Sequence, residues 1–338
     1  RRGAARRWAA SGLAMVMATE SPPIPAAAGD SALRWTFIVA AGHLPTVGRT
    51  VASILDQRAG EILEVLIGGV DRHGVVPHDP RTRFLADMPP GPACRVYNRG
   101  LAEARGDWIA FVDGDCVLDP GWLDAVMARQ AQGWDLVAGG LDLDGDYWSR
   151  AYNLACFHRE LGHLPAGQRQ ALPTMNLACA TATARRIGPF REDLARCYDY
   201  DWTLRLARSG GRLVFDPAAR VRHYPCAVTP GLLWRTFYAG GRCSQVVRRQ
   251  HAAVIWCPWL FDRPRLTRLA APLLALLLTL RVLGSAPRDI RMWQALPVLL
   301  GTRLAWWLGV SDGRRLGPLS PADYAFRAPP VEAAARPG

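Results

Sequence analysis

Two carboxylates stand at the end of an apolar segment in the stretch RGDWIAFVDGDCVLDPGWL, residues 105–123. Asp113 and Asp115 follow strand-like residues and enclose a single glycine. Carboxylate oxygens at a strand end suit a hard cation such as Mg²⁺ or Mn²⁺, and the glycine allows a diphosphate to approach the backbone closely. The same residues are also typical of a capped turn, because an Asp-Pro pair follows them.

The elements around these carboxylates alternate between strand and helix patterns. Short apolar runs predict strands at LRWTFIVAAG, EILEVLIGGV and DWIAFVDGD. Apolar residues at helical spacing predict a helix over residues 47–55, and proline predicts the start of another at Pro120. This alternation predicts a doubly wound α/β sheet, in which ligands bind beyond the carboxyl ends of the strands. Asp113 and Asp115 lie at such an end.

The longer stretch YNRGLAEARGDWIAFVDGDCVLDPGWL resembles the second conserved block of family 2 glycosyltransferases. The residues that fall in the family's order are Asn98, Gly100, Ala104, Gly106, Asp113, Asp115, Pro120, Trp122 and Leu123. The likeness continues in NLACATATARRIGPF and in YDYDWTLRLARSGGRLVFDPAARVRH, so that it covers roughly residues 35–249. It implies the GT-A fold, a Rossmann-like α/β/α sandwich with a mostly parallel sheet, over residues 32–225.

The resemblance also implies roles for individual residues in an inverting glycosyltransferase that uses Mg²⁺ or Mn²⁺. Asp113 would face the ribose of a nucleotide-diphospho-sugar donor, and Asp115 would bind the metal together with His223. Asp199, in the position of the second residue of the family's Glu-Asp pair, would be the general base for the acceptor hydroxyl. Asp201, two residues further on, is expected to cap the following helix, which leaves Asp199 as the freer carboxylate.

Ala40, Asp71 and Asn98 complete the residues expected to contact the nucleotide-sugar. Two strand ends depart from the family here. The first strand ends in Ala40-Ala41-Gly42-His43 without the usual proline, and the second ends in Gly68-Gly69-Val70-Asp71, where the family has Asp-Asp-Gly-Ser. The base-reading carboxylate is therefore missing or displaced to Asp71.

Two further departures are aromatic. Tyr97 replaces an arginine before Asn98, and Tyr198 replaces the glutamate of the Glu-Asp pair. These departures leave a second hypothesis open, namely a non-catalytic relative that binds a nucleotide-sugar or a partner.

Residues 226–313 are predicted to be helical and strongly apolar. The stretch TPGLLWRTFYAGGRCSQVVRRQH predicts a basic amphipathic helix, and two apolar segments follow it. The uninterrupted apolar run between Arg268 and Arg281 has 12 residues, fewer than the ~20 of a membrane span. Arginines and tryptophans beside apolar runs, such as the pair Trp306-Trp307, are typical of membrane interfaces. The alternative to membrane association is that the two apolar segments form a buried helical hairpin. We expect association with the cytoplasmic face of a bacterial-type membrane and a glycan or lipid-linked hydroxyl acceptor.

Composition and cysteine and histidine spacing argue against nucleic-acid-binding and zinc-binding proteins. The formal charge is +12, and all 41 basic residues are arginine, which reflects either GC-rich coding or an attraction to phosphates. No known nucleic-acid-binding motif accompanies this charge, so no nucleic-acid partner is expected. No two of the eight cysteines have C-x-x-C spacing, and His158 and His163 lack the spacing of a zinc pair. Residues 1–31 and 314–338 are predicted to be tails.

Overall fold

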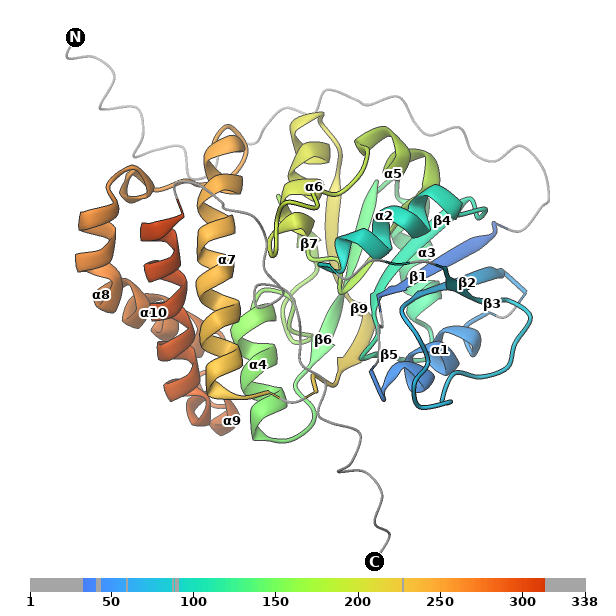
Figure 1. Ribbon diagram of the computed structural model, residues 1–338, viewed down its shortest axis with the longest axis horizontal. Coiled ribbons are helices and arrows are strands. Elements are labelled where there is room, and N and C mark those ends of the chain that lie inside the picture. The colour runs from blue at the N-terminus through green and yellow to red at the C-terminus, as the bar shows by residue number, and fades with distance from the viewer. Residues whose placement is uncertain are drawn as a thin grey trace, which may run out of the picture.

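The structure is a computed structural model that describes residues 33–40, 44–58, 60–86, 88, 91–226 and 228–313. The two predicted tails and Ala41–His43 lie outside the described residues. The described chain forms a sheet covered by helices on both faces, with a group of long helices packed against one side (Figure 1).

The strands are β1 (Trp35–Ala40), β2 (Ile62–Gly68), β3 (Thr82–Leu85), β4 (Trp108–Asp113), β5 (Cys116–Leu118), β6 (Leu136–Asp142), β7 (Gly167–Gln168), β8 (Asn176–Ala180) and β9 (Leu213–His223). The helices are α1 (Val47–Leu55), α2 (Cys94–Glu103), α3 (Trp122–Ala131), α4 (Tyr147–Phe157), α5 (Thr181–Ile187), α6 (Tyr198–Arg208), α7 (Pro230–Gln250), α8 (Pro264–Leu283), α9 (Ile290–Gln294) and α10 (Leu296–Asp312), with a short 3₁₀ helix η1 (Trp259–Asp262).

The strands pair in the order β3-β2-β1-β4-β8-β6-β9-β5, and β7 pairs with β9. β1 is parallel to both of its neighbours, β2 and β4, and β3 is parallel to β2. β8 runs antiparallel to both β4 and β6, so β4 and β6 point the same way, and β9 is parallel to β6. The sheet is therefore mostly parallel, as predicted, and the carboxyl ends of most strands meet at one edge.

Strand alternation distributes the core between two helical layers. Phe37 and Val39 of β1 pack on one face, in a cluster with residues of α1 and α3. Ile38 points to the other face and packs with α2, α5 and α6. Because both faces are covered, these strands are apolar at every position rather than at alternate ones, which is the pattern of a buried parallel sheet. The predicted α/β/α sandwich is confirmed.

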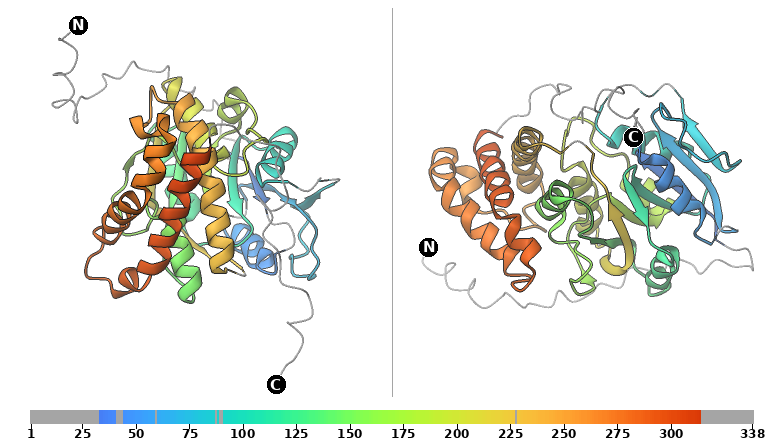
Figure 2. Two further views of the ribbon diagram at one scale, coloured as in Figure 1. Left: turned by 60° about the vertical axis from the view of Figure 1, so that its left-hand side comes forward. Right: turned by 90° about the horizontal axis from the view of Figure 1, so that it is seen from below.

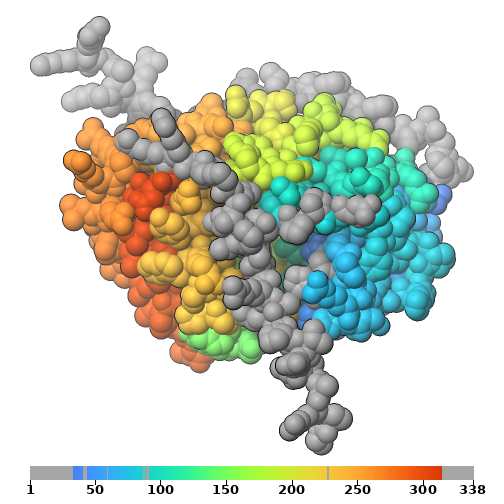
Figure 3. Space-filling view, in the orientation of Figure 1, coloured from blue at the N-terminus to red at the C-terminus, as the bar shows by residue number. Residues whose placement is uncertain are grey.

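The C-terminal helices α7, α8 and α10 lie side by side, away from β1–β3 (Figures 1 and 3). The predicted pair of apolar segments corresponds to α8 and α10, and α9 connects them. Glycines let α7 and α10 approach closely, since a Cβ at Gly241 would overlap the carbonyl oxygen of Trp306, and one at Gly309 would overlap that of Tyr238. Helix α4 packs between this group and the sheet (Figure 2).

Candidate active site

A cavity of about 1690 Å³ lies between the strand ends and the C-terminal helices. Asp113, Asp115, Asp199 and His223 line it together at the sheet side. Residues from α4, α7, α8 and α10 line its other side. Four predicted site residues from three separate regions of the sequence therefore share one space.

The Asp-Gly-Asp turn is held by hydrogen bonds from α1 and its N-terminus. The hydroxyls of Thr46 and Thr50 both donate to the carbonyl oxygen of Gly114, at 3.2 and 3.0 Å. The Gly114 amide donates to the carbonyl oxygen of Ala40 at the end of β1. The two carboxylates therefore belong to a fixed turn, and they also line the cavity. A cation or diphosphate at this turn stays a prediction.

Strand pairing brings His223 to Asp115. β5 begins directly after Asp115 and pairs antiparallel with the end of β9, which sets Cys116 opposite His223. The Nε2 atom of His223 lies 3.1 Å from Oδ1 of Asp115. Burial disfavours the imidazolium, but the Asp115 carboxylate outweighs burial and raises the pKa of His223.

Asn153 on α4 fixes the orientation of the His223 ring. Its amide nitrogen donates to the His223 carbonyl oxygen at 3.0 Å, so its amide oxygen faces Nδ1 of the ring at 2.6 Å. Nδ1 therefore carries a proton and donates, and Nε2 is directed at Asp115. A histidine that binds a metal commonly donates its other ring N–H to such a partner. Asn153 was not predicted, and no local sequence signal marks it.

The pair Asp115–His223 fits a divalent cation. An octahedral ion with ligands at ~2.0–2.1 Å sets neighbouring ligands about 3 Å apart, and the two donor atoms here are 3.1 Å apart. The Cys116 sulfur lies within 4.8 Å of both. Burial raises the pKa of this thiol well above its usual value, and Mg²⁺ and Mn²⁺ prefer oxygen to sulfur. Asp115 and His223 are thus the ligands that these residues offer.

The unusual Tyr97 contacts the other carboxylate. Its hydroxyl donates to Oδ1 of Asp113 at 2.6 Å, and its ring packs against Phe111 and Phe190. Burial, followed by the charge of Asp115, raises the pKa of Asp113, while the hydrogen bond from Tyr97 acts against this. Sequence reasoning treated Tyr97 only as a departure from the family, and its contact with Asp113 was not predicted.

Asp199 lines the cavity from the first turn of α6. Its Oδ1 accepts a hydrogen bond from the backbone N–H of Tyr200 at 2.8 Å. Burial, with a smaller contribution from the charge of Asp113, raises the pKa of Asp199 to about 6. A carboxylate with this pKa is ionised at neutral pH yet accepts a proton more readily than an exposed aspartate does, which is the property of a general base.

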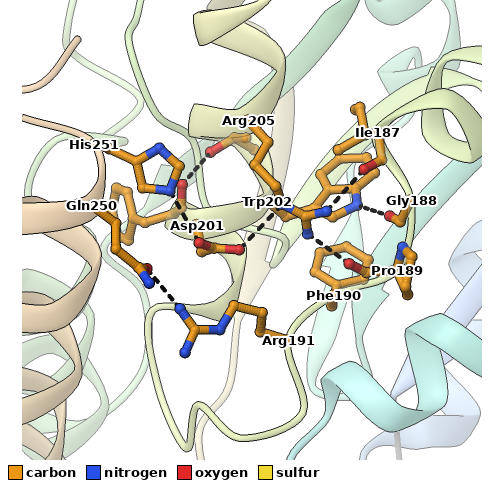
Figure 4. A network of polar contacts seen from close by, with 12 residues as sticks. Ile187, Gly188, Pro189, Phe190, Arg191, Asp201, Trp202, Arg205, Gln250 and His251 are labelled. Carbon is orange, nitrogen blue, oxygen red and sulfur yellow. Dashed lines mark hydrogen bonds and ion pairs between the residues drawn. The ribbon is translucent and has the colours of Figure 1, made fainter. Parts of the chain in front are cut away.

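The expectation that Asp201 caps a helix is wrong. Helix α6 begins at Tyr198, so Asp201 lies in its first turn and Cys197 occupies the N-cap position. The buried Asp201 carboxylate instead contacts His251 Nε2 at 3.0 Å and Arg205 Nε at 3.2 Å (Figure 4). Since His251 directly follows α7, this contact ties α7 to α6 beside the cavity.

Asp71 is directed into its own loop. Its carboxylate accepts hydrogen bonds from three backbone N–H groups, those of His73, Val75 and Val76. It is absent from the described residues that line the cavity, whereas Gly69 and Val70 are among them. A contact between Asp71 and the base stays a prediction, and the structure assigns this carboxylate a role in folding the loop.

Ala40 and Asn98 have different surroundings. Ala40 ends β1 and lines the cavity. The Asn98 side chain donates to the carbonyl oxygen of Phe190 at 3.0 Å and accepts from the Phe190 N–H at 2.7 Å. Asn98 does not lie among the described cavity residues, so it fixes the loop after α5, and its predicted donor contact is untested.

Comparison with known proteins relates the part of the chain that carries Asp113 and Asp115 to a family. Residues 93–194 match the family described as Glycosyl transferase family 2. Among curated proteins, the chain is 28% identical over 167 residues to the pre-mycofactocin glycosyltransferase of Mycobacterium tuberculosis, over 47% of this chain and 35% of that protein. It is 27% identical to glycosyltransferase AglE of Haloferax volcanii, over 52% and 54% of the two chains. It is 34% identical to succinoglycan biosynthesis protein ExoO of Rhizobium meliloti, over 32% and 34%.

Among solved structures, mannosyltransferase PcManGT from Pyrobaculum calidifontis, in complex with GDP-Man and Mn²⁺, superposes with a TM-score of 0.49 at 14% identity, over 84% of this chain and 89% of that chain. This similarity concerns shape alone. The chain spans about a third to a half of the length of the curated relatives it matches. The matched segment includes the end of β4, Asp113 and Asp115, and the family match identifies residues 93–194 as a glycosyltransferase family 2 segment.

Proposed function

We propose that the protein is an inverting, divalent-metal-dependent glycosyltransferase that moves a sugar from a nucleotide-diphospho-sugar to a hydroxyl acceptor. One observation carries the proposal. Asp113, Asp115 and His223 gather at one position of the cavity, and Asp199 reaches the same cavity from a different element. The reaction needs both a binding site for the diphosphate and a separate general base.

Asp115 and His223 would hold the cation, and Asp113, fixed by Tyr97, would accept hydrogen bonds from the ribose. A bound Mg²⁺ or Mn²⁺ supplies positive charge that stabilises the leaving diphosphate. Asn153 keeps the His223 ring in place, so the donor site requires little reorganisation when it fills.

Asp199 would remove the proton from the acceptor hydroxyl as it attacks the sugar. Its raised pKa of about 6 keeps it ionised at neutral pH and makes it a better proton acceptor than an ordinary aspartate. Direct attack by an acceptor that a single base activates, with no covalent sugar–enzyme step, inverts the anomeric centre.

The acceptor side faces the C-terminal helices. A glycan acceptor is supported by the relative named for succinoglycan biosynthesis. Helix α8 exposes a row of leucines at helical spacing, namely Leu266, Leu269, Leu273, Leu276, Leu277 and Leu280. Leu269 is 80% exposed, and Trp256 nearby along the chain is 72% exposed. We propose that this face lies on a membrane rich in anionic lipid, because arginines border the leucine row.

By length and composition, α8 is the one helix in the described part of the chain that could cross a membrane, and a third of its most apolar window is buried in the protein. Three arginines and Pro272 interrupt it. These features favour a helix that lies along the surface.

A donor panel tests the function. UDP-, GDP-, dTDP- and CDP-sugars are added with Mn²⁺, with Mg²⁺ or with EDTA, and thermal shift and release of nucleotide diphosphate are measured. We expect one nucleotide class to stabilise the protein and to be consumed, only with metal. NMR of the product or of the released sugar then reports the anomeric configuration. Retention of configuration, or turnover that EDTA does not reduce, contradicts the proposal.

The end of β2 supports the non-catalytic alternative. Asp71 is the one carboxylate that closely follows this strand, and it accepts hydrogen bonds from the backbone of its own loop. The same panel separates the two functions. Metal-dependent binding of a nucleotide-sugar without turnover on any glycan or lipid acceptor favours the alternative. Membrane association is tested separately by co-sedimentation with phosphatidylglycerol vesicles, against phosphatidylcholine vesicles and a Leu269→Gln/Leu273→Gln variant.

A further inference from the structure

The far side of the cavity carries a cluster of basic side chains from three helices. His158 and Arg159 follow the end of α4, Arg281 lies on α8 and Arg303 on α10, and all four line the cavity. Arg303 is only 7% exposed. Its Nη2 donates to Nδ1 of His158 at 3.0 Å, and its guanidinium lies over the ring of Phe237 at 5.8 Å.

Helix α4 links this cluster to the metal ligands. Asn153, which holds His223, lies five residues before His158 on the same helix. At a rise of ~1.5 Å per residue, the cluster is about 7.5 Å further along the helix axis. The cavity therefore carries carboxylates at the strand ends and this basic cluster beyond the end of α4.

The arginines of the basic cluster have no ion-pair partner among the described residues. In the described part of the chain, none of the guanidinium groups of Arg159, Arg281 and Arg303 forms an ion pair with a carboxylate. The acidic groups that act on Arg303 are Cys156 and Tyr200. Burial raises the pKa of Cys156 to about 11 and that of Tyr200 further still, so both are neutral at physiological pH.

The neighbouring titratable groups reinforce this imbalance. Burial, together with the charges of Arg303, Arg159 and Arg281, lowers the pKa of His158 well below its usual range. Its Nδ1 can therefore accept from Arg303, as a neutral imidazole does. Glu160, next to Arg159, is buried, and its pKa is raised to about 7. Burial lowers the pKa of Arg303 itself to about 10.

Burying a cation without a partner costs free energy, because its hydration is lost and no ion pair replaces it. For Arg303, the hydrogen bond to His158 and the contact with the Phe237 ring offset part of this cost, but neither partner carries a negative charge. Arg303 is the buried cation of the cluster, whereas Arg159 and Arg281 are exposed. A buried cation on a cavity wall is an expected feature of a site for an anion.

The walls beside the cluster are apolar and continue to the outside. Leu274, Leu278 and Val282 of α8 and Trp306 of α10 line the same cavity. Leu277, also on the cavity wall, belongs to the exposed leucine row of α8. An apolar chain could thus run from the basic cluster to the helix face that we place on the membrane.

We propose that Arg159, Arg281 and Arg303 form a subsite for the acidic group of an amphiphilic acceptor, a phosphate ester on an apolar chain. The phosphate would bind the three arginines, the chain would lie along α8, and the reacting hydroxyl would extend toward Asp199. Guanidinium groups match phosphate oxygens in geometry and charge. The inference rests on the proposed function, because it takes the occupant of this end of the cavity to be the acceptor.

A binding experiment without donor or metal tests the subsite separately from the chemistry. n-Octyl phosphate, 1-octanol and inorganic phosphate are titrated into the full chain and followed by calorimetry. We expect octyl phosphate to bind at least tenfold more tightly than either of the other two. Arg281→Gln should weaken octyl phosphate about tenfold, since a charge-assisted hydrogen bond contributes ~1.5–3 kcal/mol. Arg265→Gln, on the same helix but outside the cavity residues, should change nothing.

Arg303 is tested by a pair of variants, because its burial makes unfolding a risk. Arg303→Gln should weaken octyl phosphate more than Arg281→Gln does, and Arg303→Lys should restore part of the affinity. Circular dichroism and thermal unfolding verify that each variant is folded. A folded Arg281→Gln protein that binds octyl phosphate like the wild type overturns the proposal, and so does equal binding of octanol or of inorganic phosphate.

The two proposals fail in different ways. Asp199→Asn should bind octyl phosphate like the wild type, because Asp199 serves the reaction and not the subsite. If the donor panel finds no turnover while octyl phosphate binds as expected, the subsite stands and the transferase proposal falls. If turnover occurs but the arginine variants bind octyl phosphate like the wild type, the transferase proposal stands and the subsite proposal falls.

Discussion

The two ends of the cavity are built differently. At the sheet end, Asp113 and Asp115 lie in a turn whose backbone is fixed by Thr46 and Thr50, and His223 is fixed by strand pairing and Asn153. At the helical end, Arg281 and Arg303 stand on helices that are positioned by apolar packing and by close contacts at glycines. One end is acidic and held by hydrogen bonds, and the other is basic and held by packing.

This difference fits the proposed function. A metal and a diphosphate require atoms placed within tenths of an ångström, which hydrogen-bonded strand ends provide. The apolar chain of an acceptor requires an apolar surface and a charged group that binds its phosphate. The apolar helices and their arginines would provide both. The difference predicts that substitutions at the sheet end abolish turnover, while substitutions at the helical end change binding or stability.

The largest effect is expected for Asp115→Ala. Removing a metal ligand should reduce kcat/KM by roughly 1000-fold, because the charge on the leaving diphosphate loses several kcal/mol of stabilisation. The measurement is donor turnover over a range of Mn²⁺ concentrations. Asp124→Ala on α3, an exposed aspartate outside the cavity residues, is the control. Wild-type turnover in Asp115→Ala would contradict the proposal that Asp115 binds the metal.

Asp199→Asn should lower kcat by about 100-fold or more, because the acceptor hydroxyl loses its base. In the wild type, activity should decline as the pH falls through about 6, where Asp199 takes up a proton. A raised pKa in the folded protein means that this group's contribution to stability is complete below the usual aspartate pKa and is lost as the pH rises through about 6. The Asn variant, which resembles the protonated form, should therefore unfold at pH 8 no more easily than the wild type.

An intermediate effect is expected for Tyr97→Phe. The ring contacts with Phe111 and Phe190 remain, and only the hydrogen bond to Asp113 is lost. Donor KM should rise about tenfold with a smaller change in kcat, because a hydrogen bond to a charged group contributes ~1.5–3 kcal/mol. Unchanged donor KM would mean that Asp113 does not face the ribose.

The smallest effect on turnover is expected for Gly309→Ala, which instead tests how the helical end is held. The added methyl group would meet the carbonyl oxygen of Tyr238 on α7 and should destabilise folding by about 1–3 kcal/mol. Gly301→Ala, on the same helix with open space around it, is the matched control and should be neutral or slightly stabilising. Urea unfolding measures both. Equal stability of the two variants would contradict close packing of α7 on α10.

Much of the sheet end could be predicted from the sequence. The apolar runs and their spacing predicted the sandwich, and the order of motifs predicted that Asp113, Asp115, Asp199 and His223 belong together. The start of α6 was wrongly predicted at Asp201, because aspartate is common both at the N-cap and in the first turn of a helix. The role of Asp201 is decided by its tertiary contact with His251. Asp71 and Asn98 were assigned by position in the family, while here Asp71 contacts the backbone of its own loop and Asn98 contacts the backbone of the distant Phe190.

The sequence by itself determined the fold class, the family and the strand end that carries Asp113 and Asp115, because these depend on local periodicity and on short motifs. Only the tertiary structure decided that Tyr97 binds Asp113, that Asn153 orients His223, and that arginines from α8, α10 and the segment after α4 line one cavity. The reason is physical: contacts between residues up to 145 positions apart, as between His158 and Arg303, depend on how helices pack, and no local pattern records that.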